Sequence, residues 1–274
     1  MKQDGIALIM VLVVAALLSL LVIEFAFIMR ADTRIMEYRQ SDRSAYHLGR
    51  GGVSLAMHIL RADSPLVDSL NDIWAREFPP IADEKGAVDI RISDEDGKIN
   101  VNRLVSETGE INMAVYGILE RLLDIAGADP GAADAMAEEL RLREGAGFFT
   151  RNEILDIPGA DAVLEYVTIY TDGLVNINTA LAVVLESLSW GIDCALAGEI
   201  AARRDSAPFG SLSQLAGIQG VSEEVMREIS ALAKVRSRVF SIEVNADSAG
   251  RKKNIISVVE RTRDDFRVLY WRAI

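Results

Sequence analysis

One unbroken apolar run opens the chain after a short polar segment. Residues 6–23 carry no charged side chain, and Ser19 is the one polar residue among them. A helix of this length extends about 27 Å, which matches the hydrocarbon layer of a bilayer. Glu24 follows at the edge of that layer, where a carboxylate costs less than at its centre. The pattern predicts a membrane-spanning helix over residues 6–29, behind a polar segment at residues 1–5.

The helical pattern continues beyond the membrane segment. No proline precedes Pro65, which is the first residue expected to end the helix. Small and apolar residues recur there at the spacing of one helix face: Leu48, Gly52, Leu55, Ala56, Ile59 and Leu60. We therefore predict one helix of about 55 residues, half in lipid and half packed on a folded body. Gly49, Gly51 and Gly52 mark a bend or a point of close packing.

Strand patterns occur in two regions that are far apart in the chain. In the first, apolar residues alternate with polar ones on both sides of an Asp-Glu-Asp-Gly turn at residues 94–97: Val88, Ile90 and Ile92 before it, Ile99 and Val101 after it. This arrangement predicts a β-hairpin. The alternation returns near the C-terminus in three groups: Phe240, Ile242 and Val244; Ile256 and Val258; Phe266, Val268 and Tyr270. These groups predict three strands in a meander.

The region between the strands, residues 104–235, has helical periodicity and contains an internal repeat. Residues 138–160 align without gaps to residues 199–221. The matched pairs are Glu138 with Glu199, Arg143 with Arg204, Glu144 with Asp205, and Phe148 with Phe209. We predict two related helical units, at about residues 111–166 and 176–233, that arose by duplication.

Each unit has the outline of a helix-hairpin-helix or SAM-like module. Two capping boxes are predicted, Thr150 with Glu153 and Ser211 with Gln214, and a glycine ends each short helix, Gly159 and Gly220. Such hairpins often bind DNA phosphates, but here Glu223 and Glu224 follow the second hairpin and would repel phosphate. Both acids instead suit the start of a helix capped by Ser222. Packing or protein contact is therefore the favoured role of the units.

Charge and cysteine content narrow the function further. The chain has 41 Asp and Glu residues against 29 Lys and Arg, a net charge of -12, which argues against nucleic acid as the main partner. Cys194 is the single cysteine, so no intrachain disulfide can form, and its apolar neighbours predict a buried thiol. The acidic groups at residues 83–84, 94–96 and 264–265 are predicted to be solvated turns, with calcium binding as the alternative. No catalytic motif is present, so an enzyme is not expected.

The N-terminal segment KQDGIALIMVLVVAALLSLLVIEF resembles a type IV prepilin leader followed by its retained helix. The resemblance extends along nearly the whole chain to the minor pseudopilin K family of type II secretion systems. Its markers here are DGKINVNRL, FFTRNEILDIPGA, GLVNINTA and PFGSLSQL. A small sheet split by a large helical insert, with these motifs in this order, is more specific than the leader alone.

The resemblance implies processing, location and partners. Prepilin peptidase would cleave between Gly5 and Ile6 and methylate Ile6. The helix would anchor the protein in the lipid of the bacterial inner membrane, with the N-terminus cytoplasmic and the body periplasmic. The protein would join the minor pseudopilins I and J at the tip of the pseudopilus, and prime its assembly on the inner-membrane platform for protein secretion.

Met10 departs from the pattern of the pilin class, where the fifth mature residue is usually Glu. That Glu is thought to pair with the N-terminal amine of the subunit ahead, and without this partner it would be a desolvated charge in lipid. The resemblance therefore implies a subunit with no neighbour ahead of it. An ordinary apolar anchor residue is the alternative explanation.

The predicted fold class is α+β. A pilin-like long N-terminal helix packs on a small antiparallel sheet, formed by residues 30–103 and 236–274. The sheet is split by the all-α insert at residues 104–235, which holds the duplicated units.

Two other functions remain open from the sequence: a minor pilin of a type IV pilus or competence system, and a membrane-anchored helix-hairpin-helix protein that binds DNA. Calcium is left open as a cofactor and no other is predicted, because relatives in the family have been seen with calcium. The corresponding loop here, residues 247–253, is rich in Lys and Arg, so those ligands are not transferred to this chain.

Overall fold

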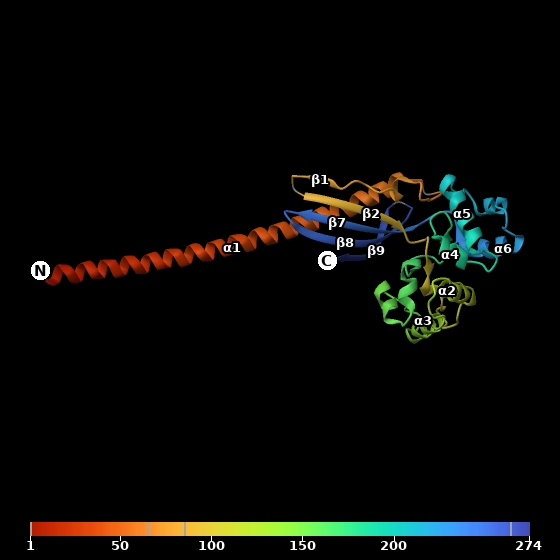
Figure 1. The fold of residues 1–274 in the computed structure, drawn as a ribbon, viewed down its shortest axis with the longest axis horizontal. Coiled ribbons are helices and arrows are strands. Elements are labelled where there is room, and N and C mark those ends of the chain that lie inside the picture. The colour runs from red at the N-terminus through yellow and green to blue at the C-terminus, as the bar shows by residue number, and fades with distance from the viewer. Residues whose placement is uncertain (1, 65, 85, 264) are drawn as a thin grey trace.

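A single long helix projects from a folded body (Figure 1). This helix, α1 (Lys2–Ala62), has 61 residues and extends about 90 Å. It passes through the three glycines as continuous helix, and the predicted long helix is confirmed. The computed structural model describes residues 2–64, 66–84, 86–263 and 265–274, with side chains from Ile9 onward.

The body is built on a five-stranded sheet in which every neighbouring pair is antiparallel. The strands are β1 (Ile81–Asp83), β2 (Gly86–Asp94), β7 (Val239–Ser248), β8 (Arg251–Arg261) and β9 (Phe266–Ala273), in the order β1-β2-β7-β8-β9. The predicted C-terminal meander is therefore confirmed. Ala249 and Gly250 join β7 to β8 with φ values of 51° and 79°, which is the backbone of a tight two-residue hairpin turn.

The predicted hairpin around residues 94–97 is wrong. β2 pairs on one side with β1 and on the other with β7, in the register Ile90 with Val244 and Ile92 with Ile242. The segment after the turn, β3 (Ile99–Asn100), leaves the sheet and pairs in parallel with β4 (Val167–Thr168) of the insert. The alternation of apolar and polar residues correctly located β2, but its partner strand, β7, comes from the C-terminal part of the chain.

The second half of α1 covers one face of the sheet and approaches it closely at two glycines. A Cβ added at Gly49 would lie 2.7 Å from Cδ1 of Ile255, and one added at Gly52 would lie 2.7 Å from Cγ1 of Val244. Gly51 has no atom within 4 Å of the added Cβ. Two of the three glycines therefore mark close packing. Leu55, placed on the buried face from the sequence, is 38% exposed.

Gly52→Ala is expected to destabilise the body by about 1–3 kcal/mol, because the new methyl group overlaps Val244 and Val88. Gly51→Ala is the matched control, and should leave stability unchanged or raise it by up to about 1 kcal/mol through helix propensity. Thermal unfolding of the full chain in detergent measures both. Equal shifts in the two variants would contradict the close-packing explanation.

The insert has its own hydrophobic core, separate from the core between α1 and the sheet. Its first unit contains α2 (Met113–Ile125), α3 (Gly131–Leu142) and two 3₁₀ helices, η3 (Arg151–Asp156) and η4 (Ala160–Tyr166). Its second unit contains α4 (Ala182–Ser187), α5 (Cys194–Ser206), the 3₁₀ helix η5 (Leu212–Gly217) and α6 (Glu223–Leu232). Two short 3₁₀ helices, η1 (Ile73–Ala75) and η2 (Val101–Arg103), lie in the connections before it.

Each unit is closed by a short parallel ladder and an asparagine clamp. β3 pairs with β4 in the first unit, and β5 (Val175–Asn176) pairs with β6 (Ala233–Lys234) in the second. Just after β3, the Asn102 side chain donates to the carbonyl of Phe148 at 3.0 Å and accepts from its N–H at 2.8 Å. Asn178 binds the backbone of Phe209 in the same way, at 3.0 and 2.9 Å.

This clamp extends the internal repeat beyond the predicted one. The motifs GKINVN and GLVNIN both supply the clamp and its strand. The clamped residues are 46 apart in the first unit and 31 apart in the second. A comparison without gaps could not bring both pairs into register, which is why the sequence repeat was recognised only in part.

The predicted caps and turns are confirmed in part. Thr150 and Glu153 form the capping box, with the Glu153 side chain accepting from the Thr150 N–H at 2.7 Å. The second box is wrong, since the Gln214 side chain accepts from Gly210 instead. Gly159 and Gly220 both have positive φ, 79° and 100°, as their turns require.

Two further predictions concern the second unit. Ser222 caps α6 by accepting from the N–H of Val225 at 3.2 Å, as predicted. Cys194 is exposed rather than buried, because it is the first residue of α5 and its side chain lies outside the core.

Candidate functional site

The exposed part of α1 is the first candidate site. Every described residue of this helix from Ile9 to position 40 is exposed, and the helix is long and apolar enough to cross a membrane. Met10 lies in this segment and is 65% exposed. Gly5 and Ile6 lie within α1, but only their backbone belongs to the described part of the structure. The predicted processing site and the role of Met10 therefore stay predictions.

A second candidate is an acidic cluster at residues 94–96, which the structure places differently from the sequence prediction. Asp94, Glu95 and Asp96 are 8%, 1% and 0% exposed, so the prediction of a solvated turn is wrong. The prediction holds for Asp83 and Glu84, which are exposed at the end of β1 and in the turn after it, and for Asp265, which is exposed in the bend before β9. Asp264 is outside the described residues. The three buried acids lie where the chain passes from β2 into the insert.

Asp94 joins the end of β2 to the second unit of the insert. Its Oδ2 accepts from the hydroxyls of Thr179, at 2.5 Å, and Ser237. The Asn176 side chain also donates to Oδ2, at 3.4 Å. The other oxygen, Oδ1, accepts from the N–H of Asp96 at 2.8 Å.

Glu95 and Asp96 bind different parts of the insert and its exit. Glu95 pairs with Lys98 at 2.5 Å and accepts from the Thr168 hydroxyl at 2.5 Å. Asp96 pairs with Lys234 at 2.8 Å, and also accepts from the backbone N–H groups of Arg238 and Val239, at 2.5 and 3.0 Å. These two acids therefore connect the start of the insert to both of its units and to the start of β7.

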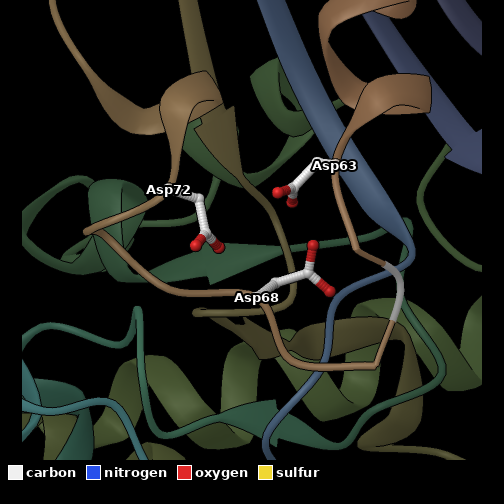
Figure 2. A group of neighbouring side chains, drawn as sticks. All are labelled: Asp63, Asp68 and Asp72. Atoms are coloured by element: carbon white, nitrogen blue, oxygen red, sulfur yellow. The ribbon is translucent and has the colours of Figure 1, made fainter.

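Three more aspartates follow the end of α1, and Figure 2 shows their carboxylates gathered together. Oxygens of Asp63, Asp68 and Asp72 lie within 4.8 Å of one another. Asp68 is fully buried, where it accepts from the N–H of Ser237 at 2.7 Å and from Nη1 of Arg261 at 2.9 Å. Asp72 accepts from the N–H of Ser69 at 2.7 Å.

These aspartates fit an ion-pair network better than a metal site. Calcium takes about six to eight oxygen ligands. Here both oxygens of Asp68 already accept hydrogen bonds, and the guanidinium of Arg261 supplies the positive charge.

We give the name acidic junction to Asp68, Asp94, Glu95 and Asp96, whose partners come from the sheet, the insert and the segments between them.

Burial changes the protonation of the acidic junction. Burial, with the charge of Asp96 beside it, raises the pKa of Asp94 to about 7. Burial also raises the pKa of Asp68, to about 6, and that of Asp96, although Lys234 opposes the rise for Asp96. For Glu95, burial is outweighed by Lys98 and by the Thr168 hydroxyl, so its pKa is lowered.

The stability of the protein is expected to fall as pH rises from about 5 to about 7.5. An unfolded Asp titrates near pH 3.9. Because Asp68 and Asp94 titrate at higher pH when folded, the native state binds more protons across this range, and stability decreases with pH. Glu95 stays ionised throughout, since its pKa is lowered. Thermal unfolding at several pH values measures the slope.

Asp94→Asn supplies the control for this pH dependence. The amide of Asn has nearly the same shape as the carboxyl group of Asp but does not titrate. The variant should therefore show a flatter dependence of stability on pH. A slope of the same size in this variant would show that Asp94 is not its source.

Known proteins resemble this chain in sequence and in fold. The family model for type II secretion system protein K matches residues 175–233, which run from β5 to β6. The chain is 26% identical to the type II secretion system protein K of Pseudomonas aeruginosa over 313 aligned residues, which cover 96% of this chain and 90% of that protein. The resemblance to protein K is confirmed. The chain is a minor pseudopilin of the type II secretion system.

A solved structure shares the fold of the present chain. It is a chain in the crystal structure of the GspK-GspI-GspJ complex from the type 2 secretion system of enterotoxigenic Escherichia coli. The TM-score is 0.69 at 16% identity, covering 87% of this chain and 99% of that one. The class is structural rather than enzymatic, and the N-terminal apolar helix fits an inner-membrane anchor.

Sequence reasoning missed the acidic junction, although two signals were present. The three consecutive acids stand directly at the end of a buried strand, not between two polar segments. Asn176 and Thr179, which bind Asp94, belong to the GLVNINTA motif. An amide and a hydroxyl in a short apolar segment indicate buried polar partners, and a buried carboxylate is one group that needs them.

Proposed function

We propose that the chain occupies the tip of the periplasmic pseudopilus, together with the minor pseudopilins I and J, and primes assembly of the filament. The position of the insert carries this proposal. The insert lies at the end of the body farthest from the free N-terminal part of α1 (Figure 1), so a subunit stacked beyond it would meet the insert rather than a bare sheet and helix. The related chain of known structure crystallised in a complex with I and J proteins, which supports the same partners here.

Processing at the start of α1 belongs to the same proposal. Prepilin peptidase cleaves after Gly5 and methylates Ile6, and the remaining helix holds the protein in the inner membrane until the assembly platform takes it up. The N-terminus faces the cytoplasm and the body lies in the periplasm. The apolar and exposed character of α1 up to Met29 supports this anchoring role.

Two measurements test the proposal. Mass spectrometry of the mature N-terminus should find methylated Ile6, and an N-terminus at Met1 would contradict processing. Coexpression of the full-length chain with I and J, followed by sizing in detergent, should give a ternary complex. A salt-sensitive shift of DNA by the full chain, without such a complex, would favour the DNA-binding alternative.

Met10→Glu is expected to leave formation of the complex with I and J little changed. A subunit with no neighbour ahead gains no ion pair from the carboxylate, and Met10 lies on the exposed part of α1, away from the packing of the body. Sizing of the coexpressed complex compares the two forms. If the complex forms only with Glu at this position, the explanation of Met10 as a tip feature fails.

A further inference from the structure

A hollow of about 320 Å³ lies between the sheet and the first unit of the insert. Its floor includes a cross-strand row of residues, one from each of four strands: Arg91, Glu243, Ile256 and Arg272. These side chains belong to the sheet face opposite α1, because they alternate with the residues that α1 covers. Arg151 and Tyr170 of the insert and Tyr270 of β9 complete the walls. We call this the arginine hollow.

The lining of the arginine hollow has more arginines than acids: Arg91, Arg151 and Arg272 against Glu95 and Glu243. Among the described residues, no ion pair joins Arg91, Arg151 or Arg272 to an acid, although the chain has a net charge of -12. Both acids have hydrogen-bond partners outside the three arginines, although Glu243 lies opposite Arg91 in the sheet register and the charge of Arg151 acts on Glu95. Glu95 pairs with Lys98 at 2.5 Å, and Glu243 accepts from the Asn254 side chain at 2.8 Å.

Its walls also contain an unused donor and two aromatic rings. Nη2 of Arg151 donates to the carbonyl of Leu164 at 2.5 Å, but its Nε is buried without a hydrogen-bond partner among the described residues. Tyr170 and Tyr270 lie with ring centroids 6.3 Å apart. Burial and the charge of Glu95 raise the pKa of Tyr170 to about 12, so its hydroxyl stays a donor at neutral pH.

We propose that the arginine hollow binds a carboxylate, an Asp or Glu side chain or a C-terminus, presented by a partner subunit of the tip complex. Guanidinium groups match carboxylates in geometry as well as charge, and an acceptor entering the hollow would meet donors from both sheet and insert. The face is also available, because α1 covers the other side of the sheet. This inference rests on the proposed function and names the surface through which the partner docks.

The test uses the full-length chain, coexpressed with I and J and purified in detergent. Arg91 and Arg272 are replaced together by Gln, since neither side chain makes a hydrogen bond or ion pair among the described residues and the fold should tolerate the change. Arg227→Gln, exposed on α6, removes a charge elsewhere and serves as the control. A photo-crosslinking amino acid at Tyr270 then identifies the segment that occupies the hollow.

The double variant should weaken association with the partners by about tenfold or more, as loss of an interfacial charge pair typically does. The wild-type complex should weaken with salt more steeply than the double variant. The Arg227→Gln control should bind like wild type. The crosslinked partner peptide should contain Asp, Glu or the C-terminus.

Three outcomes would overturn the inference, and they can be distinguished. If the double variant binds like wild type, or if the crosslinked peptide contains neither Asp, Glu nor the native C-terminus of the partner, the hollow is not the docking site, while the proposed function stands. If the wild-type chain forms no complex with I and J, the proposed function fails and this inference fails with it.

Discussion

Phe148→Ala is expected to destabilise the insert by about 3–5 kcal/mol, the usual cost of removing a buried aromatic ring. Phe148 is 3% exposed, and Asn102 holds its backbone on both sides of the residue. Arg143 stacks over the ring at 4.7 Å, so the variant also loses a cation–π contact. Urea unfolding of the full-length chain in detergent measures the change.

The chain supplies an adjacent control for this experiment. Phe149 follows directly, has the same chemistry and is 70% exposed. Phe149→Ala should therefore change stability by less than about 0.5 kcal/mol. If the two variants lose equal stability, Phe148 is not the residue that the first unit of the insert is built around.

Asp96→Ala is expected to cost about 3–5 kcal/mol, because it leaves buried partners without their acceptor. Lys234 would keep only its second partner, Asp172, and the N–H groups of Arg238 and Val239 would lose their hydrogen bonds. Those groups lie at the point where the insert returns to the sheet. We therefore expect the insert and the sheet to unfold in two separate steps instead of one.

Differential scanning calorimetry of the full chain can resolve the two steps. Asp124→Ala, exposed on α2, is the control and should change stability by no more than about 0.5 kcal/mol. A single cooperative transition in Asp96→Ala, with unchanged midpoint, would show that the acidic junction does not couple the two parts.

The elements best predicted from the sequence are those specified by local patterns. An apolar run without proline was enough for α1, and strict alternation with short connections was enough for β7, β8 and β9. Gly159 and Gly220 were predictable as turns because only a residue without a side chain readily takes their positive φ. In each case the information lies within about ten residues along the chain.

The features that were mispredicted depend on distant partners. The apolar alternation around residues 94–97 is compatible with a hairpin, and only β7, supplied from the far end of the chain, shows that β2 pairs elsewhere. Asp94 and Asp96 were predicted to be solvated because their partners cannot be assigned from local sequence. These partners are Thr179, Lys234 and Ser237. Cys194 has apolar neighbours, which predicted burial, but it is the first residue of α5 and its thiol is exposed.

The insertion of two helical units into the sheet has a consequence for the order of folding. Asp96 and Val239, which are hydrogen bonded, are 143 residues apart in the chain, and closing such a long loop in an unfolded chain is entropically costly. The insert closes its own core through nearer contacts, and once folded it holds the end of β2 beside the start of β7. We therefore expect the insert to form early and the sheet to follow. Defects in its helices would then slow maturation of the sheet, whose own residues are unchanged.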